Sequence, residues 1–278
     1  MRMALMYGAI LLFSVFISWI IFFSLTHART GAWIRKYAGM QSSGVNQASS
    51  ALLVLSIAFI LNDVSQIRSK ASDVLLQEAD VLRTMGRISV NLRHDLGEPL
   101  RGMLTAYADA TLHVDWPQME KGAGGHLTAS QGSLAHAIQI SDFLFSKLDE
   151  IGHPMLSSQL IHGVQQLRAY RLQRIELSVK HPSFEKVALS LFFCLIAICV
   201  LTLTHTEKPR ALRASVFLFS WLTMTTLYAI LNMHNPYIGI SPVTNAPIAS
   251  AFERLKVMSR ASETIYTGAP APEAQPRR

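Results

Sequence analysis

The stretch from Ser50 to Leu92 constrains the fold of this chain more than any other. It begins with apolar residues typical of a membrane span, up to Leu61, and continues into a charged segment with one glycine and no proline. Residues three and four apart lie on one face of a helix. Ten of the eleven positions in this register are apolar, and Glu78 is the exception. The eleven positions are Ile57, Ile60, Val64, Ile67, Ala71, Val74, Glu78, Val81, Met85, Ile88 and Leu92. The pattern predicts one continuous helix that starts in lipid and extends into water.

The other apolar residues are concentrated in blocks of similar length. Together with the apolar start of this helix, residues 46–62, the chain has four such blocks. The other three cover residues 4–25, 187–204 and 212–231. A helix of about 20 mostly apolar residues crosses a bilayer. We therefore expect an all-α integral membrane protein with four transmembrane helices in two pairs and an intervening extramembrane helical bundle. A signal peptide is the alternative for the first block, but its apolar run is longer than usual for one.

This pattern divides the chain into five segments. Residues 1–62 form the first transmembrane pair, 63–185 the bundle, 186–231 the second transmembrane pair, 232–260 a post-span loop and short helix, and 261–278 a disordered tail. Within the bundle, Gly97 and Pro99 are expected to end the first long helix, and Trp116 with Pro117 to stop the second. No segment alternates as a strand would.

Two later bundle helices have recognisable faces. The third is expected to bury the side formed by Leu134, Ile138, Ser141, Phe145 and Leu148. The fourth, over residues 156–180, carries one stripe of Leu156, Leu160, Leu167, Arg174 and Leu177. A further amphipathic helix after the last span would bury Ile248, Phe252 and Leu255.

The charge distribution argues against a nucleic-acid partner. The net charge is +7, but residues 63–185 hold 12 Lys and Arg against 14 Asp and Glu. The excess of basic residues lies in short loops and tails, as in membrane proteins, and not on one basic face. Cys194 and Cys199 both fall in an apolar block, and five residues apart they do not share a helix face. The lipid bilayer is therefore the expected partner, and no cofactor is predicted.

No pattern in the chain predicts an enzyme. His94 to Arg101 resembles the phosphoacceptor box of sensor histidine kinases, but no nucleotide-binding motif follows it. His113 and Asp115 could contribute to a metal site, although two ligands are too few for one. We therefore assign no catalytic, cofactor-binding or metal-binding residue.

Glu78 is the one charged residue on the stripe of the long helix. A buried carboxylate must be paired, protonated or placed against water. Arg174 occupies the apolar stripe of the fourth bundle helix, and Arg171 lies one turn away. A structural ion pair between Glu78 and Arg174 is the first hypothesis. The alternative is that Glu78 faces a central pathway in an oligomer.

The second apolar block carries polar residues at helical spacing. Ser49, Ser56, Ile60 and Asp63 fall on one strip of its helix. Such a strip could line an ion pathway with apolar constrictions. Alternatively, small residues such as Ser49 and Ser56 allow two helices to pack closely. The sequence leaves both interpretations open.

Several motifs now occur in a recognisable order. They are Glu78 to Leu82 after the second span, Tyr107 followed by Asp115, Trp116 and Pro117, then Arg171 and Arg174, and finally Asn235, Pro236, Tyr237 and Gly239 followed by Ser241 and Pro242. Together they resemble the bestrophin-like membrane proteins of bacteria and plants. This chain departs from that family's pattern at Asp115 (Glu), at Gly86 (commonly Tyr), at His234 and Asn235 (Asp-Arg) and at Tyr237 (Phe).

The resemblance implies kinship with bestrophins, pentameric anion channels whose second helix lines the pore. On this basis we expect a multi-pass protein of the bacterial inner membrane. It would form a homo-oligomeric ion channel or conduit for a small inorganic ion. The alternative is a non-conducting signalling or scaffold protein whose bundle binds another protein.

Overall fold

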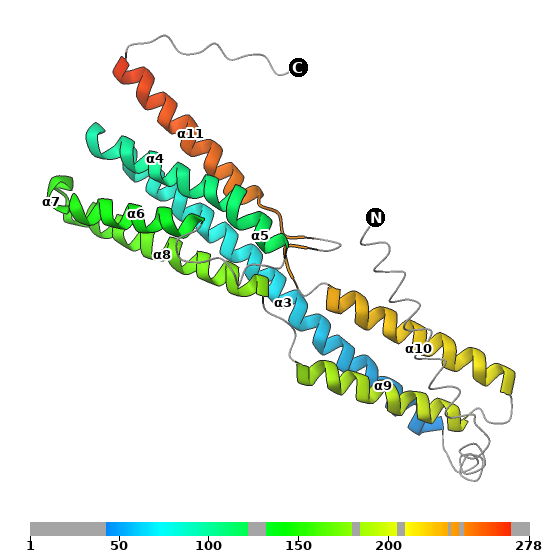
Figure 1. The fold of residues 1–278 in the computed structure, drawn as a ribbon. Helices are drawn as coiled ribbons and strands as arrows, with labels where there is room; N and C mark the ends of the chain where they lie inside the picture. Colours follow the sequence, from blue (N-terminus) through cyan, green and yellow to red (C-terminus); the bar gives the residue numbers. More distant parts are fainter. Residues whose placement is uncertain are drawn as a thin grey trace, which may run out of the picture. The chain divides into compact units, whose positions relative to one another are not determined.

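The structure is a computed structural model that describes residues 43–121, 132–179, 184–204, 209–232, 235–238 and 242–267. Every regular element in these ranges is a helix (Figure 1), so the all-α prediction is confirmed for them. The chain divides into two compact units, an apolar unit and a helical bundle. The predicted first span, residues 4–25, lies outside the described residues.

The predicted long helix is confirmed as α3, which runs from Ser43 to Val90 without interruption. Its buried positions follow the expected spacing, with Ile60, Val64, Ala71, Glu78 and Met85 all removed from solvent. The helix ends in a turn at Asn91, whose N–H donates to the Ile88 carbonyl oxygen at 3.0 Å. The helical stripe of the sequence is therefore the buried face of α3.

The apolar unit contains the first half of α3 together with α9 (Phe184–Thr204) and α10 (Pro209–Asn232). Leu53 of α3 packs into a cluster with Cys194, Ala197 and Ile198, while Ile60 packs with Val64 and Ile230. Among the described residues, the helical stretch Gln47–Val90 is the only one long and apolar enough to cross a membrane. The apolar stretches described in α9 and α10, Ala188–Ile198 and Phe217–Ile230, are shorter.

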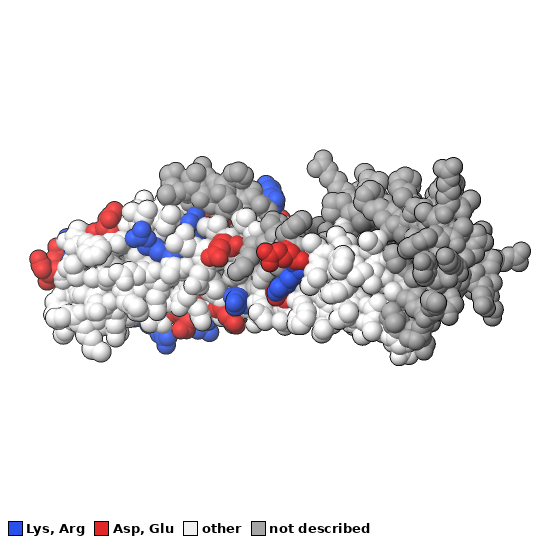
Figure 2. All heavy atoms as spheres, turned by 90° about the horizontal axis from the view of Figure 1, so that it is seen from below, with Lys and Arg blue, Asp and Glu red and all other residues white. Residues whose placement is uncertain are grey.

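The bundle contains the second half of α3 and most of the remaining helices. These are α4 (His94–Ala110), the π-helical turn η2 (Thr111–Asp115), α5 (Trp116–Glu120), α6 (Ser133–Ser146), α7 (Leu148–Ile151), α8 (Pro154–Val179) and α11 (Ala246–Thr267). Helix α4 packs against α6 and α11, and α6 packs against α8. Figure 2 shows acidic and basic side chains interspersed over the bundle surface, in keeping with its nearly balanced charge.

Two predicted helix breaks in the bundle are wrong. The break falls at residues 91–93, and Pro99 lies inside α4, in the second turn, where the missing N–H removes one hydrogen bond near the helix start. Pro117 begins α5 instead of stopping a helix, because the first N–H groups of a helix need no partner within it. The turn η2 joins α4 to α5 without a loop.

The predicted buried face of α6 is also wrong. The buried residues are Ser133, Ala137, Ile140 and Leu144, whereas Ile138 and Phe145 are exposed. This face, which combines the small Ser133 and Ala137 with Ile140 and Leu144, is the one that packs against α4 and α8. The apolar content of the sequence therefore pointed to the wrong side.

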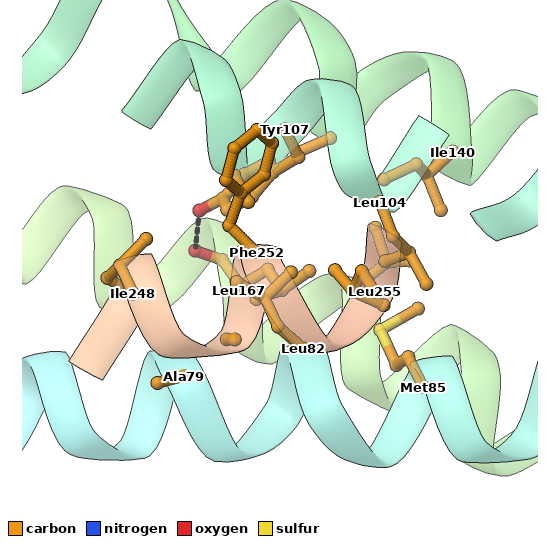
Figure 3. Close-up of a cluster of buried hydrophobic side chains, with 14 of the residues drawn as sticks. Ala79, Leu82, Met85, Leu104, Tyr107, Ile140, Leu167, Ile248, Phe252 and Leu255 are labelled. Atoms are coloured by element: carbon orange, nitrogen blue, oxygen red, sulfur yellow. Dashed lines mark hydrogen bonds between the residues drawn. The ribbon is translucent and has the colours of Figure 1, made fainter. Parts of the chain in front are cut away.

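The C-terminal helix is part of the bundle core. Ile248, Phe252 and Leu255 of α11 are buried as expected, and they pack among side chains of α3 and α4 (Figure 3). The helix continues to Thr267 and so extends beyond residue 260. Leu255 lies against Gly86 of α3, where a β-carbon would come within 2.6 Å of its Cδ2 atom. Glycine at this position therefore gives α11 its close approach.

Candidate functional site

Asp115 is a fully buried carboxylate at the end of η2. Its Oδ2 atom accepts hydrogen bonds from Ser133 Oγ at 2.6 Å, Arg171 Nε at 3.2 Å and Arg174 Nη2 at 3.2 Å. Three donors on three side chains thus converge on one oxygen atom. Asp115 therefore joins α6 and α8 to the turn that carries it.

Local backbone geometry brings Asp115 to this position. The π-helical turn ends at Asp115, and Gly132, just before α6, has a positive φ of 70°. A β-carbon at Gly132 would overlap Asp115 Oδ1, so only glycine fits both the conformation and the contact. The Ser133 N–H donates to the same oxygen at 3.4 Å. The carboxylate thus lies at the N-terminus of α6, where helix N–H groups favour negative charge.

Glu78 is the second carboxylate that contacts Arg174. Arg174 Nε lies 3.3 Å from Glu78 Oε2, and neither side chain is exposed. The Tyr107 hydroxyl donates to Glu78 Oε1 at 2.7 Å and also lies 3.3 Å from the Leu167 carbonyl oxygen (Figure 3). Arg174 is therefore shared between the two carboxylates. We refer to Glu78, Asp115, Arg171 and Arg174 as the charged cluster.

The charges of this cluster balance, because it holds two carboxylates and two guanidiniums. Burial raises the pKa of Glu78, and the attraction of Arg174 offsets this only in part. Burial alone would lower the pKa of Arg174, but Glu78 and its other neighbours raise it, so Arg174 stays charged. Burial also raises the pKa of Tyr107, which keeps its hydroxyl as a donor. Since the four charged side chains are at most 1% exposed, they cannot reach a substrate in solvent.

The segment after α10 packs beside the charged cluster. Tyr237 lies edge-on to Trp116, with ring centroids 5.2 Å apart and an interplanar angle of 72°. Its hydroxyl donates to the Arg174 carbonyl oxygen at 3.4 Å. Asn235 Nδ2 donates to the Met119 carbonyl oxygen at 3.0 Å. Pro236 is also buried, Pro117 is half-buried, and Gly239 lies outside the described residues.

The strip on the second predicted span is buried along most of its length. Ser49, Ser56 and Ile60 are buried, and Ser56 Oγ donates to the Leu53 carbonyl oxygen at 2.8 Å. Asp63 is half-buried, and its Oδ2 lies 2.6 Å from Lys186 Nζ. Ile60 thus contacts Ile230 of α10, and Asp63 contacts Lys186 of α9.

The histidine considered for a metal site points away from Asp115. His113 is exposed, and its Nδ1 lies 3.1 Å from Asp109 Oδ1, whereas Asp115 is buried. The described part of the chain has no group of three or more His, Cys, Asp or Glu side chains that could hold a metal ion.

Sequence reasoning missed two residues that shape the charged cluster, Gly132 and Ser133, and the role of a third beside it. Ser133 and Gly132 follow a glycine-rich stretch that carries no signal of a carboxylate contact. Asn235 belongs to one of the motifs, but its amide contact with the Met119 carbonyl oxygen has no signal in the sequence. The order of the motifs was the available signal, because Tyr107, Asp115, Trp116 and Tyr237 all meet at this place.

A family model described as the Bestrophin-like domain matches residues 5–248. The chain belongs to the Bestrophin-like family. Its fold is similar to a crystal structure of a bacterial bestrophin homologue from Klebsiella pneumoniae, with a TM-score of 0.64 and 11% identity, over 90% of this chain and 97% of that one. It is also similar to a crystal structure described as a membrane protein, with a TM-score of 0.65 and 13% identity, over 91% and 98% of the two chains.

At these identities the likeness to the solved structures is one of fold. None of the curated proteins matches the chain. Helix α11 lies almost entirely beyond the Bestrophin-like match, yet Phe252 and Leu255 contribute to the core of the bundle. The fold of this Bestrophin-like chain therefore includes a core helix at the edge of the family match.

Proposed function

We propose that the protein is a multi-pass membrane protein, in a bacterial inner membrane, that assembles as a homo-oligomeric conduit for a small inorganic ion. The four-helix arrangement predicted from the apolar blocks would embed each copy in the bilayer. Membership of the Bestrophin-like family and the fold shared with a bacterial bestrophin homologue support this proposal.

The observation that carries the proposal is an uncovered side of α3. Leu52, Leu55 and Phe59 are exposed large apolar residues at helical spacing, and exposed Asn62 and Gln66 continue the same side. Apolar rings followed by neutral polar groups are a common lining of a gated pore. This side, and not the strip of Ser49, Ser56 and Ile60, is the one we assign to an ion path between copies.

The same side of α3 remains open to water further along the helix. Asp73, Asp80 and Thr84 are exposed there. A cavity of about 310 Å³ opens between α3 and α8, and Asp80, Thr84, Gln159 and Gln166 are among its lining residues. A polar, open continuation of the apolar stripe is what a wide vestibule next to a narrow pore requires. The exposed carboxylates on this side favour cations over anions.

The test compares two sides of one helix in purified protein. Phe59→Ala should raise the single-channel conductance in planar bilayers, because it removes an apolar ring from the narrow part of the path. Leu61→Ala is the matched control, since Leu61 is also exposed but lies about 200° around the helix from Phe59. Native mass spectrometry would count the copies. A monomer that does not conduct would overturn the proposal and support the scaffold alternative.

A further inference from the structure

Asn235, which follows α10, both donates and accepts hydrogen bonds within the bundle. The Asn235 amide donates to the Met119 carbonyl oxygen of α5, while its Oδ1 atom accepts from the Tyr237 N–H at 2.9 Å. An aspartate at this position could accept but not donate. The Val243 N–H donates to the Pro236 carbonyl oxygen at 2.8 Å, which closes the loop.

Tyr237 joins this loop to α8. Its ring packs on Trp116, and its hydroxyl donates to the carbonyl oxygen of Arg174. The guanidinium of that same arginine contacts Glu78 and Asp115. Burial raises the pKa of Tyr237, so the hydroxyl keeps the proton that it donates. One residue, Arg174, therefore connects the charged cluster with the loop.

The loop contacts two helices of the bundle at the same time. Helix α8 leads into α9, and the loop follows directly after α10. Within the bundle, the loop contacts α8 through Tyr237 and α5 through Asn235. Motion of the loop away from both helices must break the Tyr237 hydrogen bond to α8 and the Asn235 hydrogen bond to α5.

We propose that Asn235, Pro236 and Tyr237 form a latch that ties the ends of α5 and α8 together within the bundle and couples them to the charged cluster. When the latch is intact, the ends of α5 and α8 are fixed together. When it opens, α8 loosens around Arg174, and the contacts of Arg174 with Glu78 and Asp115 weaken. The latch does not depend on conduction, so it stands apart from the proposed function.

The test measures backbone hydrogen exchange of the full chain in lipid nanodiscs. Tyr237→Phe removes one hydroxyl and keeps the ring contact with Trp116. We expect exchange to rise about 2- to 10-fold in residues 235–238 and also in residues 171–179 of α8, as for the loss of one buried hydrogen bond. Asn235→Ala should raise exchange in residues 116–120 as well, because it releases α5.

The matched control is Tyr170→Phe, on α8 itself. Tyr170 is half-buried, and its hydroxyl makes no side-chain hydrogen bond to any described residue. A rise confined to residues 235–238, or an equal rise with Tyr170→Phe, would overturn the latch. Wild-type protein that does not conduct would overturn the proposed function and leave this result unchanged.

Discussion

The two halves of α3 bury polar side chains in different ways. In the apolar unit, Ser56 satisfies its hydroxyl within its own helix, on the Leu53 carbonyl oxygen. In the bundle, the contacts of Glu78 are with residues of other helices, Tyr107 of α4 and Arg174 of α8. A serine can therefore be lost without disturbing its neighbours, whereas Glu78 cannot. The comparison predicts that sensitivity to substitution rises along one continuous helix.

The largest expected effect is at Glu78. Glu78→Ala leaves two guanidiniums against one carboxylate in a dry core, and breaking a buried pair in this way costs about 3–5 kcal/mol. Replacing Glu78 and Arg174 together with Met should cost far less, because both buried charges disappear. Thermal unfolding in detergent measures both variants. A coupling energy below about 0.5 kcal/mol in this double-mutant cycle would show that the two side chains act independently.

Whether a contact of the charged cluster could be predicted from the sequence depends on whether it follows from residue spacing along single helices. Glu78 and Arg174 each stand on an apolar stripe, so their helices had to bring them to a buried place, and the sequence alone pointed to this pair. The contacts of Asp115 could not be predicted, because they depend on the π-helical turn and on the positive φ of Gly132, which pattern spacing does not encode.

The apolar half of α3 is a second instructive case. The polar strip of Ser49 and Ser56 is compatible with a pathway or with a helix contact, since small polar residues suit both. The structure places Leu53 against Cys194 and Ile60 against Ile230, two contacts that the sequence does not predict. Long-range packing, and not local composition, therefore decides which side of this helix is covered.

The next effect concerns Gly86, where α11 contacts α3. Gly86→Ala places a methyl group 2.6 Å from Leu255 Cδ2, which should cost about 1–3 kcal/mol from overpacking, less up to about 1 kcal/mol gained in helix propensity. Gly102→Ala is the matched control, because a β-carbon there meets nothing within 4 Å. It should therefore stabilise the protein. Equal changes in the unfolding temperature of the two variants would contradict the close approach of α11.

The pH dependence of stability gives a third comparison. The pKa of Glu78 is raised above the usual 4.5, so the folded protein binds its proton more readily than the unfolded chain. The stability from this group is therefore fully present below about pH 4.5 and is lost as the pH rises through the folded pKa. Glu78→Gln should remove this part of the slope in a pH series of thermal unfolding. An unchanged slope would mean that Glu78 titrates normally.

The smallest expected effect is at Ser56. Ser56→Ala removes a hydroxyl bonded to a carbonyl oxygen one turn back in its own helix, and the unfolding free energy should change by about 0.5 kcal/mol or less. When Ser56→Ala and Glu78→Ala are measured in the same detergent, Ser56→Ala should show the smaller change in unfolding free energy. A loss as large as that at Glu78 would mean that the apolar half of α3 also depends on a long-range polar contact.

The exact balance of two carboxylates and two guanidiniums has a consequence for the effect of ionic strength. Dissolved ions screen charges over about 8 Å at physiological salt, but only where water reaches them. The pair of Lys186 and Asp63 is partly exposed, with 45% and 26% of the two side chains accessible, and it weakens as salt is added. The charged cluster holds no net charge and excludes solvent, so neither low nor high salt alters the attraction between its side chains. The bundle therefore keeps the same internal register in a dilute or a saline habitat.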